Sequence, residues 1–311
     1  MCGVSLKAVI CTGYGPPEVL RLTELEKPVQ GDDQVLIRVH STTVHIGDTR
    51  IRRADPFFVR LYFGLKRPKR SPILGMELAG EIESTGDDVE NFKKGDPVFA
   101  FTGFKFGAYA EYISLPAVSR KGKIEKKGLV ALKPKNLNFG EAAAVPAGAL
   151  TVLKVFQKAN IKHGQKILIN GASGSLGTYS IQMARSIGAD VTGVCSTSNM
   201  DLVRSLGADE VIDYTREDFT KVGKRFDFVF DAVDKTSRSR CRYILKEGGR
   251  FLTTNGLDKI DPGDLDMLTE MIEKEEIIPV IDRTYGLDQI VEAHGYVDRG
   301  HKKGNVVVNV T

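Results

Sequence analysis

Three glycines spaced three residues apart indicate chemistry more directly than any other pattern in this chain. Gly171, Gly174 and Gly177 follow a short apolar run and precede a helical pattern over 178–187 and a second apolar run at 191–194. Strand, glycine-rich turn, helix and strand in this order are typical of dinucleotide binding, because glycine lets backbone amides at a helix N-terminus approach a pyrophosphate. The alternative is a tight turn that binds nothing. We predict that the loop binds a cofactor through Gly171, Ala172, Ser173, Gly174, Ser175, Leu176 and Gly177.

The end of the second strand indicates which dinucleotide is bound. An NAD site usually places an acidic residue there to hold the ribose 2′-hydroxyl. This chain has Ser196, Thr197 and Asn199 instead, with no acid before Asp201, and its nearest cation is Arg204. The absence of a carboxylate favours NADPH over NADH, with Ser196, Thr197 and Asn199 near the 2′-phosphate. In the alternative interpretation these side chains only cap the next helix.

Composition predicts an ordinary globular protein. The 311 residues are 41% hydrophobic and 27% charged with a net charge of +4, which indicates neither a nucleic-acid nor a membrane partner. There is no apolar run long enough to span a membrane, and a strand pattern begins too early for a signal peptide. The four cysteines, Cys2, Cys11, Cys195 and Cys241, lack paired spacing, so reduced thiols and a cytoplasmic location are expected. A removed organelle presequence remains open.

The pattern of predicted elements changes near residue 140. Short strands separated by turns are predicted at 7–11, 34–40, 77–84, 98–101 and 108–114, and this part reads as all-β. Residues 120–128 are predicted to form an exposed loop. Beyond a helical stretch at 141–159, helices alternate with strands predicted at 166–170, 191–194, 210–213, 226–232 and 250–254, which indicates a doubly wound parallel sheet. A helix at 264–275 precedes a mixed C-terminal segment.

Several motifs together resemble the medium-chain dehydrogenase/reductase family, and in particular its zinc-independent quinone oxidoreductases. They are the glycine loop and the segments 7–20, 75–81, 107–112, 141–146 and 279–283. The resemblance implies a GroES-like, mostly β catalytic domain formed by residues 1–140 and completed by 276–311. Residues 141–275 would form a Rossmann domain, with the active cleft between the two.

The same resemblance implies that zinc is not used. Zinc-dependent members place Cys near position 45 and His at position 76, and they carry a four-cysteine structural site, whereas this chain has His45 and Met76 and no cysteine cluster. His45 and Glu77 alone would be a poor zinc site, since catalytic zinc needs three protein ligands. The expected reaction is therefore hydride transfer to a quinone or an α,β-unsaturated carbonyl compound rather than alcohol oxidation.

Candidate catalytic residues follow from the resemblance. His45 replaces a family Asn three residues before Asp48, and it is expected either to position substrate or to donate a proton near neutral pH. Its alternative role is local hydrogen bonding, and that of Asp48 is helix capping. Thr151 matches a family threonine beside the nicotinamide ribose, or else lies inside a helix.

Further cofactor contacts are implied near three strand ends. Tyr214 matches a family tyrosine near the adenine or 2′-phosphate, although it is otherwise a strand-end aromatic residue. Asn255 and Gly256 end the fifth Rossmann strand, at the sheet edge where cofactors bind. Asn305 replaces the Lys of a family Gly-Lys segment near the cofactor, and Asp234 replaces a glycine at the cofactor edge.

Other functions stay open at this stage. A carbonyl reductase and an NADPH-binding protein with little turnover, in a structural, sensing or RNA-associated role, are the alternatives. Bound metal and inhibition by chelation would instead indicate a zinc alcohol dehydrogenase. The segment after Gly256 is shorter than in relatives, which often dimerise through a sixth strand there. The resemblance implies a possible homodimer, and the short segment leaves that expectation open.

Overall fold

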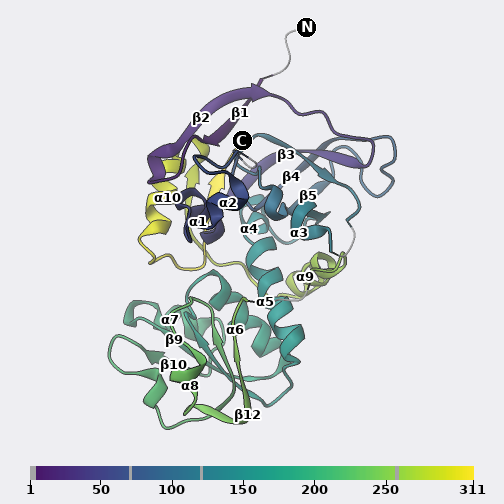
Figure 1. Cartoon of the computed structure of the whole chain (residues 1–311). Helices are drawn as coiled ribbons and strands as arrows, with labels where there is room; N and C mark the ends of the chain where they lie inside the picture. The colour runs from purple at the N-terminus through teal and green to yellow at the C-terminus, as the bar shows by residue number, and fades with distance from the viewer. Residues whose placement is uncertain (1–4, 70–71, 120–121, 256–258) are drawn as a thin grey trace. The chain divides into compact units, whose positions relative to one another are not determined.

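The computed structural model describes residues 5–69, 72–119, 122–255 and 259–311 (Figure 1). The chain forms two compact units. Unit 1 contains residues 1–147, 260–270 and 281–311, and unit 2 contains residues 148–259 and 271–280. Each unit is built from separated stretches of sequence, so residues distant in the chain come together within it.

Unit 1 is organised around a seven-stranded sheet with the order β13-β14-β3-β4-β5-β7, in which β6 also pairs with β3. The β13–β14 pair is parallel, and all the other strand pairs of this sheet are antiparallel. A separate hairpin pairs β1 with β2. The strands are β1 (Ser5–Cys11), β2 (Leu20–Glu26), β3 (Gln34–Thr43), β4 (Glu77–Thr85), β5 (Pro97–Phe101), β6 (Tyr112–Pro116), β7 (Leu129–Leu132), β13 (Ile281–Gly286) and β14 (Asn305–Asn309).

Helices of unit 1 correct two predictions. The helices are α1 (Ile46–Arg53), α2 (Val59–Phe63), α3 (Ile124–Lys127), α4 (Phe139–Ala143) and α10 (Ile290–Asp298). The all-β prediction missed α1, which forms because Asp48 caps its first turn and basic residues occupy its last turn. Part of the expected loop at 120–128 is α3, whose Ile124 is fully buried. Helix α9 (Asp264–Glu273) continues from unit 1 into unit 2.

Strand boundaries also differ from the sequence prediction. Among residues 1–140, two strands were not predicted: β2, which buries only its first residue, and the four-residue β7. The strand expected at 108–114 begins at Tyr112, because Tyr109 and Ala110 pair with β1 instead. The strand expected at 250–254 begins earlier, at Leu245, and ends at Leu252.

Apolar side chains from both ends of the chain form one core in unit 1. Val44, Ile51, Phe106 and Val306 are buried in the same cluster, which joins the end of β3 and helix α1 to β14. Each fully buried aliphatic side chain contributes about 1.5–3 kcal/mol to stability. The C-terminal strand is therefore an integral part of unit 1.

Unit 2 contains a five-stranded parallel sheet with the order β10-β9-β8-β11-β12. Its strands are β8 (Lys166–Asn170), β9 (Asp190–Cys195), β10 (Glu210–Asp213), β11 (Phe226–Asp231) and β12 (Leu245–Leu252), and its helices are α5 (Pro146–Ala159), α6 (Ser175–Ile187), α7 (Met200–Ser205) and α8 (Arg238–Cys241). Leu168, Val194, Ile212 and Val229 place one buried residue from each of four strands in a shared core. The predicted doubly wound parallel sheet is confirmed.

Short 3₁₀ turns connect several of these elements. They lie at Pro17–Val19, Gly103–Lys105, Thr197–Asn199, Phe219–Lys221 and Leu287–Gln289. Among the helices described, there is none with the length and apolar character needed to cross a bilayer.

Candidate active site

The glycine loop between β8 and α6 is built so that two of its glycines cannot be replaced without strain. Gly171 has φ +84°, and a Cβ there would lie 2.3 Å from a methyl carbon of Val233. A Cβ on Gly177 would lie 2.2 Å from the Gly171 carbonyl oxygen. Gly171 therefore makes the tight turn, and Gly177 lets α6 pack closely against it.

Gly174 has a different environment, which fits a ligand. It is the N-cap of the 13-residue helix α6 and makes no side-chain cap hydrogen bond. A Cβ at this position would meet a single atom within 4 Å, the Gly171 oxygen at 3.5 Å. The backbone there is open to a close approach at the positive end of a helix dipole. The loop thus has the three glycine roles of a pyrophosphate site, and its residues fit a dinucleotide.

Side chains in the loop after β9 connect that loop to the glycine loop. Asn199 donates from its amide nitrogen to the Ser173 hydroxyl at 3.0 Å and to the Ser196 hydroxyl at 3.3 Å. Thr197 instead donates to the carboxylate of Asp213 at the end of β10. Ser196, Asn199 and the glycine loop therefore form one neutral polar group, whereas the Thr197 hydroxyl is engaged by an acid.

An arginine near this group was not identified from the sequence. Arg216 Nε lies 3.5 Å from Asp213 Oδ2, and its side chain is 76% exposed. Hydrogen bonds from Thr197 and Thr215 lower the pKa of Asp213, so this carboxylate stays charged and holds the guanidinium beside it. Arg204, the cation that the sequence suggested, pairs with Asp201 at 3.1 Å. The sequence feature that could have identified Arg216 is its position two residues after Tyr214, which the resemblance places near the adenine or 2′-phosphate.

In unit 1, His45 and Asp48 cap the first turn of α1. Asp48 Oδ2 accepts from the His45 amide at 3.1 Å and Oδ1 accepts from the Gly75 amide at 2.9 Å, while His45 Nδ1 accepts from the Gly47 amide at 3.0 Å. The local bonding foreseen as an alternative is thus present for both residues. Burial raises the pKa of Asp48 to about 7.

His45 does not titrate near neutral pH. Burial, assisted by the charges of Lys302 and Arg50, lowers its pKa to about 4. Because Nδ1 accepts a hydrogen bond, the neutral ring carries its proton on Nε2. His45 at pH 7 is therefore a neutral hydrogen-bond donor, not the titrating acid considered from the sequence.

Glu77, the first residue of β4, is buried beside these groups. Its carboxylate accepts from the Thr43 hydroxyl and, at 2.7 Å, from the Ala147 amide. Burial raises its pKa to about 7, although the nearby Lys302 ammonium opposes this shift. Both oxygens are already engaged.

These donors do not fit a catalytic zinc site. Glu77 offers no oxygen without a hydrogen-bond donor, His45 offers one nitrogen, and Met76 supplies a thioether where a nitrogen ligand would be needed. The Lys302 ammonium also acts electrostatically on both His45 and Glu77, and a nearby positive charge opposes binding of a divalent cation. The side chains at this location are unsuited to zinc.

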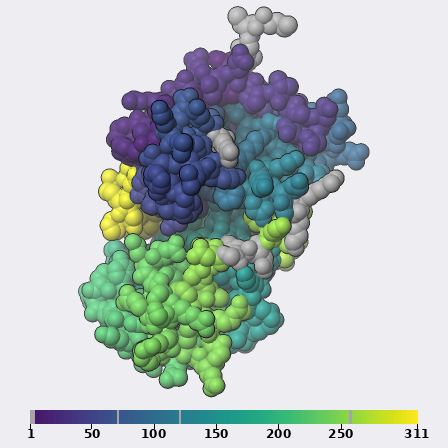
Figure 2. All heavy atoms as spheres, viewed as in Figure 1, coloured from purple at the N-terminus to yellow at the C-terminus, as the bar shows by residue number. Residues whose placement is uncertain are grey.

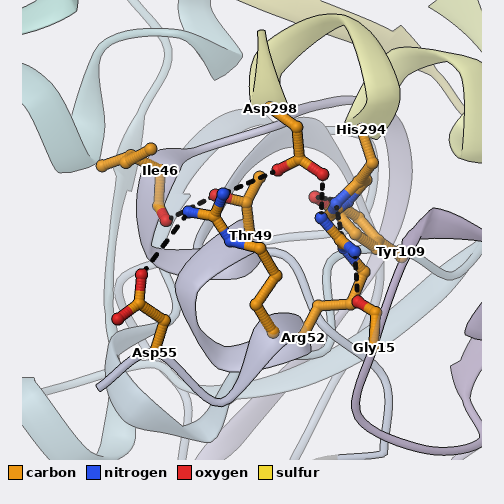
Figure 3. Close-up of polar contacts among 9 residues, drawn as sticks. Gly15, Ile46, Thr49, Arg52, Asp55, Tyr109, His294 and Asp298 are labelled. Carbon is orange, nitrogen blue, oxygen red and sulfur yellow. Dashed lines mark hydrogen bonds and ion pairs between the residues drawn. The ribbon is translucent and has the colours of Figure 1, made fainter. Parts of the chain in front are cut away.

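A buried polar network joins α1 to α10 through Arg52, His294 and Asp298 (Figure 3). Arg52 Nε donates to His294 Nδ1 at 3.3 Å, and His294 Nε2 lies 3.1 Å from the Tyr109 hydroxyl. Since arginine only donates, His294 is neutral with its proton on Nε2, which it donates to Tyr109. The Tyr109 hydroxyl in turn donates to the Thr43 carbonyl at 3.3 Å, at the end of β3. Arg52 also pairs with Asp298 of α10.

The remaining predicted residues divide between the units. Thr151 is half-buried in α5, and Asn255 is exposed after β12, its amide donating to the Thr253 hydroxyl at 3.2 Å. Gly256 lies outside the described residues. Asn305 is buried at the start of β14 in unit 1. Tyr214 is 55% exposed, and its amide donates to the Cys195 carbonyl.

Exposed apolar side chains gather on unit 1 around α2. Phe57, Phe58 and Tyr62 are 71%, 66% and 49% exposed, and Leu61 is 71% exposed. This segment, in blue, forms part of the surface in Figure 2. Phe104 is 51% exposed elsewhere in the unit. The sequence left these residues undecided between pocket and core, and their exposure shows that they are not core.

Comparisons with known proteins agree with this architecture. Residues 31–124 match the alcohol dehydrogenase GroES-like domain family, and residues 175–276 and 255–308 match families described as zinc-binding dehydrogenase. The 2-methylene-furan-3-one reductase of Solanum lycopersicum is 33% identical over 328 residues, covering 98% of this chain and 79% of that protein. The chloroplastic NADPH-dependent alkenal/one oxidoreductase of Arabidopsis thaliana is 30% identical, covering 97% and 79%.

A solved structure shows the same fold over the whole chain. The quinone oxidoreductase from Coxiella burnetii is 26% identical, with a TM-score of 0.83 and coverage of 99% of this chain and 100% of that one. A GroES-like unit combined with a Rossmann unit defines a class of oxidoreductases. The chain belongs to the medium-chain dehydrogenase/reductase family.

Proposed function

We propose that this protein is an NADPH-dependent, zinc-independent reductase of quinones or α,β-unsaturated carbonyl compounds. The observation that carries the proposal is the glycine cradle at the start of α6, joined through Asn199 to a loop without an acid at the end of β9. Relatives named alkenal/one oxidoreductase, 2-methylene-furan-3-one reductase and quinone oxidoreductase support the substrate class.

Each unit supplies a different part of the proposed chemistry. In unit 2, the glycine loop would hold the pyrophosphate, with Ser196, Asn199 and Arg216 toward the 2′-phosphate, and Thr151, Tyr214 and Asn255 would make further contacts. The nicotinamide supplies a hydride when bound. In unit 1, the neutral His45 Nε2–H would donate a hydrogen bond to the substrate carbonyl, and Asp48 would hold the start of α1 in place. Apolar side chains around α2 suit an apolar substrate.

Other parts of the proposal follow from the same features. The partner is a small molecule rather than a nucleic acid, since the net charge is only +4. We propose a cytoplasmic location, although relatives include chloroplastic and mitochondrial proteins. Asn305, buried in unit 1, is retained as a proposed cofactor contact only through the family resemblance.

A substrate panel tests this proposal. Oxidation of NADPH and of NADH is followed by absorbance with a benzoquinone, a phenanthrenequinone, a short alkenal and a saturated aldehyde, each with and without a chelator. We expect NADPH-selective reduction of quinone or alkenal that the chelator does not change. Turnover of the saturated aldehyde alone would indicate a carbonyl reductase. Binding of NADPH without turnover of any compound would indicate the non-catalytic alternative.

A further inference from the structure

Lys302 lies beside the candidate catalytic residues of unit 1 because of how β14 joins the sheet. The Val44 amide donates to the Val306 carbonyl at 2.9 Å, and Val307 pairs with Thr43. The residue after Val44 and the residues before Val306 therefore lie at the same end of these two strands. This register brings Lys302 near His45, although the two are far apart in sequence.

The electrostatic effects of Lys302 agree with this position. Its ammonium lowers the pKa of His45 and opposes the rise in the pKa of Glu77 on β4. Glu77 and Asp282 on β13 in turn favour its charged form, against a burial effect that lowers the pKa of Lys302 to about 8. Arg50 is the other charge that acts on His45.

The ammonium of Lys302 has donor capacity left for a ligand. Within the described residues, its one hydrogen-bond acceptor is the Gly304 carbonyl at 2.5 Å. An ammonium carries three donors. The acids facing it bond to other groups, since Asp282 accepts from the Tyr296 hydroxyl at 2.7 Å and the Lys303 amide at 2.9 Å. The Lys302 residue as a whole is only partly buried.

We propose that Lys302 and the His45 Nε2–H together bind the carbonyl oxygen of the substrate, and that Lys302 stabilises the negative charge that develops on that oxygen. This inference rests on the proposed function. It assigns the electrophilic role, which a metal ion would fill in a zinc enzyme, to a fixed side-chain cation. Lys302 was not among the residues implied by the family resemblance. The lysine of the family Gly-Lys segment corresponds to Asn305 in this chain.

The reaction balances with this assignment. The hydride, with its two electrons, forms a bond to the β-carbon of the unsaturated carbonyl compound. The alkene pair moves to a new bond between the α-carbon and the carbonyl carbon, and the carbonyl π pair moves onto oxygen. Lys302 faces this oxyanion with a positive charge. Water then protonates the α-carbon, so the substrate is reduced by two electrons and the cofactor is oxidised to NADP⁺.

Substitution of Lys302 and its exposed neighbour tests the proposal. Lys302→Met should lower kcat/KM for an alkenone about 100-fold, as expected on losing one oxyanion-stabilising donor. The NADPH dissociation constant should stay within about twofold. Lys303→Met, the matched control, should retain wild-type activity. A Lys302→Met enzyme with wild-type kcat/KM would overturn the proposal, and so would a loss of NADPH affinity equal to the loss of activity.

A pH profile of Lys302→Arg keeps the test decisive if Lys302→Met does not fold. Wild-type kcat/KM should fall as the pH rises above about 8, because the ammonium loses its proton. The Arg variant should hold its activity at high pH, since arginine stays charged. Identical alkaline limbs in the two enzymes would contradict the assignment. Absence of wild-type turnover with every quinone and alkenal would instead refute the proposed function itself.

Discussion

At the residue scale, surroundings change what each candidate side chain can do. His45 looks like a near-neutral acid in the sequence, but burial and two nearby cations keep it neutral down to a pH of about 4. Thr197 looks like a phosphate ligand, but its hydroxyl is bonded to Asp213. Lys302 attracts no attention in the sequence, because its neighbours are set by strand register. Residue types alone therefore do not show the protonation state of a side chain or whether its polar atoms already have partners.

Arg216 should determine the preference for NADPH. Replacing it with Ala removes the cation beside Asp213, leaving a charged acid that repels a 2′-phosphate. We expect NADPH affinity to fall about tenfold or more, since a charge-assisted hydrogen bond contributes about 1.5–3 kcal/mol, while NADH affinity should not fall. Fluorescence titration of both cofactors measures this. Arg204→Ala is the matched control, and an equal effect in that variant would contradict the role of Arg216.

At the element scale, the glycine loop and helix α1 show why some features were predictable and others were not. The glycine loop is a local pattern, so strand, turn and helix could be predicted together. Helix α1 is short and lies in a strand-rich region, and only its capping pair marks it. Strand β2 was missed because most of its side chains are exposed and its apolar alternation does not continue beyond Leu22. Contacts between distant segments, such as the hydrogen bond from the Ala147 amide to Glu77, leave no local signal.

Two substitutions should separate the roles of the loop glycines. Gly174→Ala places a methyl group where no protein atom lies closer than 3.5 Å, so the melting temperature should hardly change while NADPH affinity falls at least tenfold. Gly177→Ala forces a Cβ to within 2.2 Å of the Gly171 oxygen, which should cost about 1–3 kcal/mol of stability. Thermal unfolding and cofactor titration distinguish them. Unchanged NADPH affinity in a folded Gly174→Ala protein would argue against a pyrophosphate at this turn.

The contact between α1 and α10 should make stability depend on pH. Burial lowers the pKa of His294 to about 3 from 6.5, so the unfolded chain binds this proton first as the pH falls below 6.5. Because of His294, the free energy of unfolding should decrease as the pH falls from about 6.5 toward 3. Asp48 and Glu77, with pKa values raised to about 7, contribute in the opposite direction as the pH falls from 7 toward 4.

The His294→Gln variant isolates the histidine contribution. A glutamine amide can still accept from Arg52 and donate to Tyr109, but it does not titrate. When the pH is lowered from 7.5 to 5, the free energy of unfolding of the wild type should decrease relative to that of the variant by about 1–2 kcal/mol. Denaturant titrations at both pH values test this, with the exposed His301→Gln as control. Parallel pH dependence in wild type and His294→Gln would show that His294 is not held neutral.

At the scale of the whole molecule, the edge of the parallel sheet bears on assembly. In the described part of the chain, β12 pairs only with β11, and their register shifts near Phe226. The strand carries Lys246, which bonds to Asp227 at 2.7 Å, and Arg250, which donates to the Ala159 carbonyl at 3.1 Å. Charged side chains and irregular register oppose edge-to-edge pairing between sheets.

We therefore expect this protein to be monomeric. Light scattering coupled to size-exclusion chromatography should give a mass close to the 34.1 kDa of one chain at micromolar concentration. A mass of twice that value, lost on substituting charged residues into exposed positions of β12, would show that the edge strand forms a dimer despite the short segment that follows it.

In the proposed reaction, a hydride moves from reduced nicotinamide to the β-carbon of an unsaturated carbonyl compound. The most direct measurement uses NADPH deuterated at the transferring position of the nicotinamide, in each stereochemical form, with an alkenone as substrate. We expect NMR of the saturated ketone to find deuterium at the β-carbon from one of the two forms. Deuterium at the carbonyl carbon of an allylic alcohol, or no deuterium in any product, would contradict it.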